Sequence, residues 1–344
     1  MQPYRIGFIG GSITMGACAT TYEKTWVSKV FAGIRTRFPE RECECYNAAI
    51  SGTGSQFGVF RVKDDLLRYA PDVVFVEFAV NDVGTADRDP QSIIDSMDDM
   101  IRQIMCSRPA IPVILVYTAT RDLGNAAAVH AKVAANYGLP EIDVAAALLE
   151  RVNAGEPWDA FLMPDGVHPN DAGHALYAET VLRTLDAHPE YLTTPPRPAP
   201  SMASMLLHRP TMLPAERARL LDGFRMVDVD DDHEKIIDVM NVRRAAFADT
   251  AGSVLEFDFS GRAFGLYHSI TRNGGRIHVE IDGQDMGDCG CHWGFENDYR
   301  EFVAWYIRTD LPDGSHTARL TVTAQEGYER IHCAVAGFLV EQPE

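Results

Sequence analysis

A serine and a histidine–aspartate pair are the residues of this chain best suited to nucleophilic chemistry. Ser12 follows two glycines in a tight bend directly after the hydrophobic run Tyr4–Ile9. Asp165 and His168 lie far downstream, three positions apart, just before a helix-like segment. A serine hydroxyl is a weak nucleophile unless a neutral imidazole accepts its proton, and a carboxylate fixes the tautomer of that imidazole. These three residues therefore predict a catalytic triad.

Two further segments offer hydrogen-bond donors to an acyl transition state. Gly52 follows a second strand-like run and can present its backbone N–H, while Asn81 follows a third run and can present its side-chain amide. In open α/β sheets, ligands bind outside the carboxyl ends of the strands. We therefore expect Gly52 and Asn81 to face Ser12 at one sheet edge, where they would hold a developing oxyanion.

The elements that must position these residues alternate between strand and helix from Tyr4 to about His188. This order predicts an α/β fold, with a parallel sheet between two layers of helices. The predicted strands are Tyr4–Ile9, Cys43–Ile50, Val73–Phe78, Pro112–Thr118 and Glu141–Val144. Apolar residues at helical spacing predict helices over Trp26–Phe38, Ile93–Ile104, Ala126–Tyr137 and from Asp171 to Leu185.

A change of composition marks a second domain. The run Thr193–Pro200 is rich in proline and predicts an extended linker. Short alternating runs separated by turn signals follow, and they predict a C-terminal antiparallel β-sandwich. The predicted runs are Ser253–Phe259, Arg262–Ser269, Arg276–Ile281, Phe302–Ile307, Ala318–Val322 and Ile331–Val340. We therefore expect a catalytic domain over 1–190, a linker over 191–222 and an accessory domain over 223–344.

The overall charge restricts the partners of the protein. The 344 residues carry a formal net charge of −18, which disfavours nucleic acid and anionic membranes as partners and is compatible with a neutral or cationic small-molecule or oligosaccharide substrate. There is no apolar run long enough for a membrane span, and strand-like sequence starts at Tyr4 with no room before it for a secretory signal. We expect a cytoplasmic protein, one that can form a homodimer.

Four sequence blocks in this order resemble those of the SGNH (GDSL-type) hydrolase superfamily, over roughly Ile6 to Leu185. The resemblance implies that Ser12 is the nucleophile and also an oxyanion donor through its N–H, that Gly52 and Asn81 are the other donors, and that Asp165 and His168 complete the triad. Gly11 departs from the pattern, because the family's Gly-Asp-Ser carries aspartate at that position.

The resemblance implies an ester hydrolase that works through an acyl-enzyme without a metal or organic cofactor. With a C-terminal sandwich attached, the expected substrate is a short-chain, acetyl ester of a carbohydrate. Other members of the superfamily leave open a lysophospholipase or lipase, and an acyltransferase that uses the same residues. A protein of another class, a glycan-binding protein with a vestigial hydrolase site, also remains open.

Several residues have a structural interpretation beside a functional one. Gly11, Glu77 and Trp293 are candidates for substrate binding. The structural interpretation of Glu77 is a paired, buried carboxylate inside a strand, and that of Trp293 is an aromatic residue that covers the domain interface. Cys289 and Cys291 could ligate a metal, but no second Cys/His pair stands near them in the sequence, so free thiols are favoured. Taken alone, a Gly-Gly-Ser turn would more often be a plain loop or a phosphate cradle.

Overall fold

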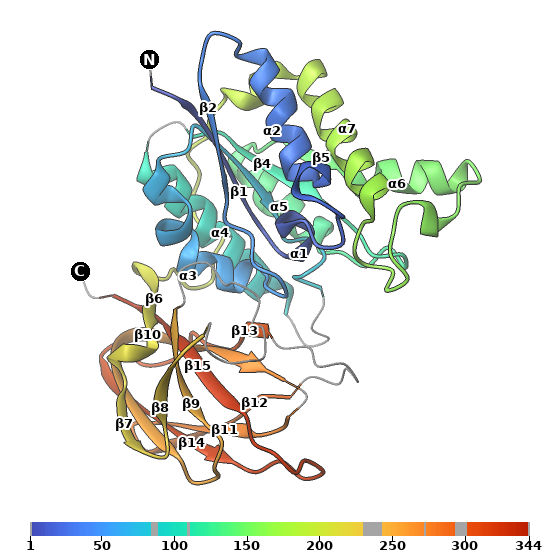
Figure 1. The fold of residues 1–344 in the computed structure, drawn as a ribbon. Helices are drawn as coiled ribbons and strands as arrows, with labels where there is room; N and C mark the ends of the chain where they lie inside the picture. Colours follow the sequence, from blue (N-terminus) through green and yellow to red (C-terminus); the bar gives the residue numbers. More distant parts are fainter. Residues whose placement is uncertain are drawn as a thin grey trace. The chain divides into compact units, whose positions relative to one another are not determined.

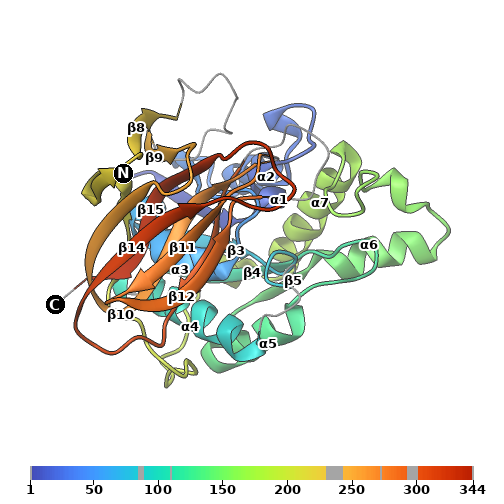
Figure 2. The ribbon, with the colours of Figure 1, turned by 90° about the horizontal axis from the view of Figure 1, so that it is seen from below.

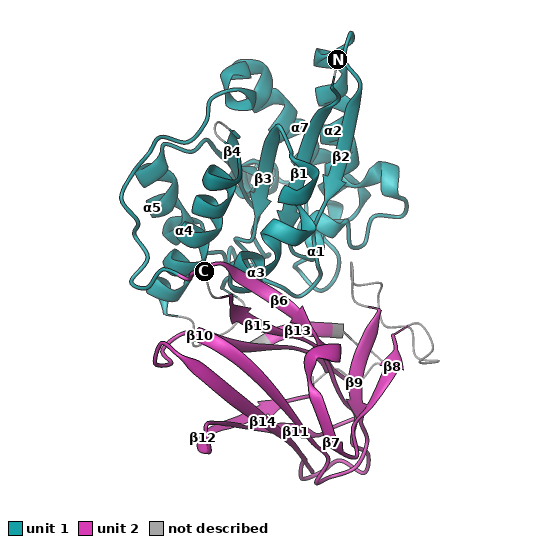
Figure 3. Ribbon diagram, turned by 90° about the vertical axis from the view of Figure 1, so that its left-hand side faces the viewer, with its two compact units in different colours: residues 1–206 teal, residues 207–344 magenta. Residues whose placement is uncertain are grey.

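The chain folds into two compact units, residues 1–206 and 207–344 (Figure 3). We describe a computed structural model of residues 2–83, 89–108, 111–229, 243–271, 273–292 and 301–342. Each unit has its own hydrophobic core. Within the described residues, no helix combines the length and the apolar character that a membrane span requires.

The first unit is a parallel sheet between helices, as predicted (Figure 1). Its strands are β1 (Tyr4–Gly10), β2 (Cys43–Asn47), β3 (Val73–Glu77), β4 (Val113–Tyr117) and β5 (Glu141–Asp143). Its helices are α1 (Ser12–Met15), α2 (Trp26–Arg37), α3 (Ser55–Asp65), α4 (Pro90–Ser107), α5 (Ala127–Tyr137), α6 (Val144–Asn153) and α7 (Asp171–Ala187).

The strand order β2-β1-β3-β4-β5 creates a switch point between β1 and β3. The chain leaves β1 toward one edge of the sheet and returns to the other side of β1 with β3, so the loops after these two strands diverge to opposite faces. Doubly wound sheets bind their ligands at such a point. Ser12 follows β1 and Asn81 follows β3, so both lie at the switch point.

Alternate residues of β1 explain how the two helix layers pack. Tyr4, Ile6 and Phe8 are buried in one core with residues of α2 and α7. Gly7 points the other way, where an added Cβ would lie 2.9 Å from the Leu66 side chain at the end of α3. Helices α3, α4 and α5 contact one another in sequence, as do α2, α7 and α6, so the two groups cover opposite faces of the sheet.

Besides the single-turn α1, two helices of this unit were not predicted from the sequence. The helix α3 is buried on nearly all sides, from Phe57 to Val62, so its residues show no polar face from which a helical period could be read. The helix α6 begins immediately after the three-residue strand β5, with Asp143 accepting a hydrogen bond from the Ala146 N–H at its start. Neither helix changes the predicted architecture.

The second unit is an antiparallel sheet of ten strands that curves around one core, and its long curved strands are visible in Figure 2. The strands are β6 (Pro210–Pro214), β7 (Arg219–Asp222), β8 (Arg225–Asp228), β9 (Arg244–Ala248), β10 (Val254–Ile270), β11 (Arg276–Ile281), β12 (Gln284–Gly290), β13 (Glu301–Arg308), β14 (Ser315–Thr323) and β15 (Cys333–Glu341). The predicted antiparallel sandwich is confirmed.

The strand β10 joins the two halves of this sandwich. Its first half pairs with β14 and β7, and its second half pairs with β13 and β15. The sequence predicted two strands here, separated at Ser260 and Gly261. The structure has one strand with a register shift between Ser260 and Phe264, and Gly261 adopts a φ of +91°, which favours glycine.

The proline-rich segment packs along the first unit. The Arg197 N–H donates to the Tyr137 carbonyl at 2.8 Å, and Asp98 accepts a hydrogen bond from the Met202 N–H at 3.1 Å. Downstream, β6 and β7 belong to the sheet of the second unit. The chain therefore passes from the first unit to the second between residues 206 and 207. This boundary lies inside the stretch 191–222 that the sequence predicted to be a linker.

Candidate active site

The structure brings Ser12, His168 and Asp165 into one hydrogen-bonded chain. The Ser12 Oγ lies 2.8 Å from His168 Nε2, and the His168 Nδ1 lies 2.8 Å from Asp165 Oδ2. A carboxylate can only accept hydrogen bonds, so Nδ1 carries the proton and Nε2 is free to accept from the serine hydroxyl. The 156 positions that separate Ser12 from His168 are bridged by the fold.

Ser12 is positioned by the junction of β1 and α1. It is the first residue of α1 and is only 6% exposed. The helix is one turn long, and its end is closed by the N–H groups of Gly16 and Ala17, which both donate to the Ser12 carbonyl. This closure fixes the backbone from which the hydroxyl projects.

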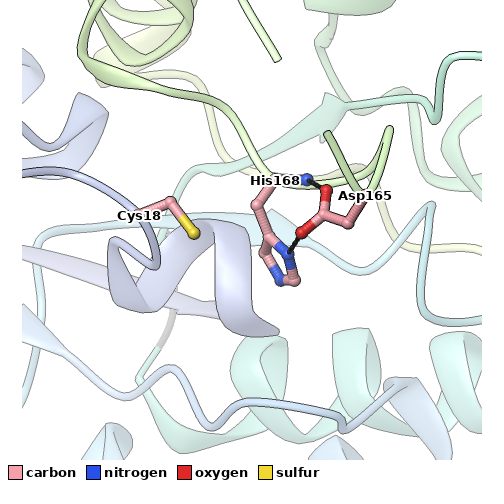
Figure 4. Close-up of side chains that lie close together, drawn as sticks. All are labelled: Cys18, Asp165 and His168. Carbon is pink, nitrogen blue, oxygen red and sulfur yellow. Dashed lines mark hydrogen bonds and ion pairs between the residues drawn. The ribbon is translucent and has the colours of Figure 1, made fainter. Parts of the chain in front are cut away.

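Asp165 and His168 lie in a loop that the Asp165 side chain itself organises. Asp165 Oδ1 accepts the N–H groups of Val167 at 2.8 Å and of His168 at 3.0 Å, while Oδ2 bonds the imidazole (Figure 4). The intervening Gly166 has a φ of +70°, and its carbonyl accepts from the Arg121 N–H in the loop after β4. The Asp-x-x-His spacing therefore both folds the loop and aligns the ring.

These bonds also set the charge of Asp165. Partial burial works to raise the pKa of its carboxyl, but the hydrogen bonds from the His168 side chain and from the two backbone N–H groups outweigh burial and leave the pKa below its usual value. Asp165 is therefore an anion at neutral pH. It can stabilise the imidazolium that forms when His168 takes a proton.

Asn81 lies beside the residue that precedes the serine. A Cβ added to Gly11 would lie 2.0 Å from Asn81 Oδ1 and 3.1 Å from Nδ2. The Asn81 amide thus fills the space into which any side chain at position 11 would project. The glycine that departs from the family pattern is what allows this close approach.

Gly52 lies in the turn after β2. The Ala48 and Ile50 N–H groups continue the pairing beyond β2 by donating to the carbonyls of Phe8 and Gly10, which carries this segment to the end of β1. Gly52 itself is exposed and has a φ of +67°. A residue with a side chain would be strained there.

Glu77 points into the protein. Its carboxylate is fully buried, with Oε2 accepting from Thr14 Oγ1 and Oε1 from Thr118 Oγ1, both at 2.7 Å. Burial raises the pKa of Glu77, although both threonine bonds act against that rise. The carboxylate joins α1, β3 and the end of β4, which favours the structural interpretation of this residue over substrate binding.

A second buried cluster, formed by Asp82 and His130, lies beside the loop of Asn81 and was not predicted from the sequence. Asp82, next to Asn81, is fully buried; its Oδ1 accepts from the Ser55 N–H and its Oδ2 lies 2.8 Å from His130 Nε2 on α5. The pair Asn81-Asp82 was a visible signal, but alone it also fits a helix cap. His130 gave no signal, because only the fold brings α5 to this loop.

Cys18 is another neighbour that was not predicted. One donor atom each of Cys18, Asp165 and His168 lie within 4.8 Å of one another. Cys18 follows α1 in a loop that contacts α7, where the Nε2 of the buried His174 lies 3.0 Å from the Ala17 carbonyl. Burial lowers the pKa of His174, which keeps its ring neutral while Nδ1 accepts the Trp26 N–H.

The two cysteines considered as metal ligands lie in the core of the second unit. Cys289 and Cys291 are buried on either side of His268, with Cys289 Sγ 3.1 Å from Nε2 and Cys291 Sγ 3.9 Å from Nδ1. The two thiols thus face different ring nitrogens and do not converge on one. Trp293, the candidate for sugar stacking, lies outside the described residues.

Comparisons with known proteins agree with this architecture. Residues 8–176 match the model of the GDSL-like Lipase/Acylhydrolase family. The whole chain is similar to two crystal structures of a two-domain esterase active on acetylated mannans, one of them co-crystallised with mannopentaose; the identities are 24% and 23%, each TM-score is 0.83, and the match covers 100% of this chain and 92% of that one. A search among curated proteins gave no match.

The likeness to the two-domain esterase shows the shared fold, and the family match covers the part of the chain that holds the candidate site. Residues 8–176 span the Ser12 loop, the Asn81 loop and the Asp165–His168 loop. The chain therefore carries a domain of the GDSL-like lipase/acylhydrolase family, which supports an enzyme that acts on ester bonds.

Proposed function

We propose that this protein is a serine esterase that removes short acyl groups, chiefly acetyl, from O-acetylated carbohydrate through an acyl-enzyme. The observation that carries the proposal is the hydrogen-bonded chain from Ser12 Oγ through His168 to Asp165. This arrangement gives the hydroxyl a base in the correct tautomer, which is what nucleophilic attack on an ester requires.

The reaction begins when His168 Nε2 takes the Ser12 proton as Oγ attacks the ester carbonyl. The tetrahedral intermediate collapses as the imidazolium gives that proton to the departing alcohol oxygen, which leaves the acyl group on Ser12. Water then attacks the acyl-enzyme while Nε2 accepts its proton, and the second collapse returns the proton to Ser12 and frees the acid. Asp165 stays ionised throughout and stabilises each imidazolium.

Charge on the carbonyl oxygen would be held by the backbone N–H groups of Ser12 and Gly52 and by the Asn81 amide. The Ser12 N–H is at the first position of a helix, where backbone donors have no partner within the helix. Support for the Asn81 amide comes from its position against Gly11, directly before Ser12. Removal of one such donor typically costs about a hundred- to thousandfold in kcat.

The exposure of the site supports a substrate carried on a sugar. The side chains of His168 and Asp165 are 27% and 46% exposed, so water for the second step reaches the base directly. Further support is the two-unit architecture, shared with an esterase active on acetylated mannans. A small acetyl group presented by a hydrophilic polymer fits an open site in a protein of net charge −18.

The test is acetate release from acetylated mannan, acetylated xylan and sugar acetates, compared between the wild type and Ser12→Ala. We expect release by the wild type and none by the variant, while Ser107→Ala, at the end of α4, remains active. Near-normal turnover by Ser12→Ala would remove Ser12 from the mechanism. Cleavage of lysophospholipid without acetate release would instead support a lysophospholipase. Binding of glycan without any hydrolysis would support a glycan-binding protein.

A further inference from the structure

A thiol lies next to the catalytic base in a position that the ester mechanism does not use. Figure 4 shows the Cys18 sulfur directed toward the His168 ring, with Asp165 bonded to Nδ1 of the same ring. One donor atom of each residue lies within 4.8 Å of the other two. Within the described ranges, no other three His, Cys, Asp or Glu residues meet this condition.

We propose that Cys18, His168 and Asp165 form a binding site for Zn²⁺, and that zinc bound there inhibits the enzyme by removing His168 from catalysis. Thiolate, imidazole and carboxylate are the three ligand types that zinc takes in proteins. Thiolate and imidazole also exclude Mg²⁺ and Ca²⁺, which prefer oxygen ligands. The binding stands on its own geometry, whereas the inhibition rests on the proposed function.

The required movement is small. Ligand bonds to zinc of about 2.0 to 2.3 Å place neighbouring ligand atoms of a tetrahedral site about 3.5 Å apart. Donor atoms that already lie within 4.8 Å need to approach by little more than an ångström. Cys18 and Asp165 are both exposed, so their side chains can make this adjustment without repacking the core.

The loop that carries Cys18 is held against α7, which begins three residues after His168. Besides the contact between Ala17 and His174, the N–H and the hydroxyl of Thr20 both donate to the Asp171 carboxylate at 2.8 Å. These bonds lie on both sides of Cys18 in the sequence. They keep the thiol near the imidazole rather than free in solvent.

Zinc at this site is incompatible with catalysis whichever ring nitrogen it takes. Nδ1 is bonded to Asp165 and Nε2 to Ser12. Coordination at Nε2 occupies the lone pair that must accept the serine proton. Coordination at Nδ1 requires the tautomer with the proton on Nε2, so that nitrogen can no longer accept the serine proton. The Cys18 proton is released to solvent on binding, and the remaining zinc positions are left for water.

The first test is direct binding of Co²⁺, a spectroscopic substitute for Zn²⁺, to the chelator-treated full chain. We expect a thiolate-to-cobalt charge-transfer band in the wild type that zinc abolishes by competition. Cys18→Ser should lack the band. The matched control is Cys106→Ser, another exposed free cysteine, which should keep it. No band in the wild type, or a band that persists in Cys18→Ser, would overturn the site.

The second test is inhibition of ester hydrolysis by zinc. Cys18→Ser should hydrolyse ester at close to the wild-type rate and need at least about tenfold more zinc for half inhibition, because loss of even an outer-shell partner costs that much metal affinity. Chelator should restore the wild type, and Mg²⁺ should have no effect. Equal zinc sensitivity in both proteins would refute the proposal. If the wild type binds cobalt but hydrolyses no ester, the proposed function fails and the zinc site remains.

Discussion

The carboxylate of Asp82 accepts the backbone N–H of Ser55 at 2.8 Å, and this bond connects the two loops that carry Gly52 and Asn81. Ser55 begins α3, three residues after Gly52, and Asp82 directly follows Asn81. The second Asp82 oxygen is bonded to the buried His130, so the carboxylate cannot turn away. The relative position of two proposed oxyanion donors therefore depends on one buried side chain.

Substitution of Asp82 should reduce the rate of the chemical step more than substrate binding. In Asp82→Ala the loops of Gly52 and Asn81 lose their connection, and their donors matter most in the transition state. We expect kcat to fall about ten- to hundredfold with KM little changed, which steady-state kinetics on a soluble ester would measure.

The isosteric Asp82→Asn separates positioning from a general loss of stability. Its amide oxygen can still accept from Ser55, so it should recover part of the lost kcat. Both variants should unfold at lower temperature, because the hydrogen bond between position 82 and the buried His130 is lost in Asp82→Ala and weakened in Asp82→Asn. If kcat follows the melting temperature in both variants, with no recovery in Asp82→Asn, Asp82 has no positioning role.

The sequence was sufficient for the fold of the first unit because its signals were local. The runs before Ser12, Gly52 and Asn81 are each recognisable as strands, and the carboxyl ends of parallel strands lie at one edge of the sheet. Residues that act across the fold carried no such signal. Cys18 and His130 are near the site only because of how α1, α5 and α7 pack, and no spacing in the chain encodes that proximity.

The position of Gly11 shows a second limit of sequence analysis. In the sequence, glycine at this position was only a departure from the aspartate of the family pattern. The structure shows that the Asn81 amide occupies the space instead. A contact between two loops 70 positions apart depends on side-chain volume, which a motif does not record.

A methyl group at position 11 should disturb the Asn81 amide and leave the fold intact. The added Cβ would lie 2.0 Å from Asn81 Oδ1, the end of a partly exposed side chain that can move away. Gly11→Ala should therefore lower kcat by up to the full cost of one oxyanion donor, about a hundred- to thousandfold. Circular dichroism and melting should remain close to the wild type.

A double-mutant cycle tests whether this effect passes through Asn81. Asn81→Ala alone should also lower kcat about a hundred- to thousandfold. Once Asn81 is alanine, the substitution at Gly11 has no amide left to displace and should cost little more. If the two losses multiply, the alanine at position 11 acts on Ser12 directly and the contact seen here does not explain it.

Asp165→Asn should lower activity without abolishing it and should change its pH dependence. Asp165 is ionised at neutral pH, because the hydrogen bonds it accepts keep the pKa of its carboxyl low. Its side chain is 46% exposed, so solvent weakens its effect on the imidazolium, and we expect a loss of about 10²- to 10³-fold rather than the 10⁴-fold seen for a buried aspartate.

The pH dependence of kcat/KM tests whether the Asp165 carboxylate stabilises the imidazolium of His168. His168 must be neutral to act as a base, so kcat/KM should rise with pH as the imidazole loses its proton. Without the carboxylate the imidazolium is less stable, so the rising limb of Asp165→Asn should move to lower pH. Asp159→Asn, in the same loop and paired with Arg121, is a control that should leave the limb in place. An unmoved limb in Asp165→Asn would contradict the proposed triad.

The free energy of unfolding of Glu77→Gln should increase relative to that of the wild type as the pH rises. Burial raises the pKa of Glu77 in the folded protein, whereas in the unfolded chain the carboxyl titrates near 4.5. Between these two values the folded protein holds more protons than the unfolded chain, so the free energy of unfolding falls as the pH rises. Glutamine has no proton to lose and can still bond Thr14 and Thr118.

The difference in unfolding free energy between Glu77→Gln and the wild type should therefore increase from about pH 4.5 upward, until the folded carboxyl has also ionised. Denaturant unfolding at a series of pH values from about 4 to about 8 measures this difference directly. Glu179→Gln is the matched control, because it removes a carboxyl on the exposed side of α7 rather than one in the core. A constant difference for Glu77→Gln would mean that the threonine hydrogen bonds offset burial fully and that the carboxylate is ionised inside the core.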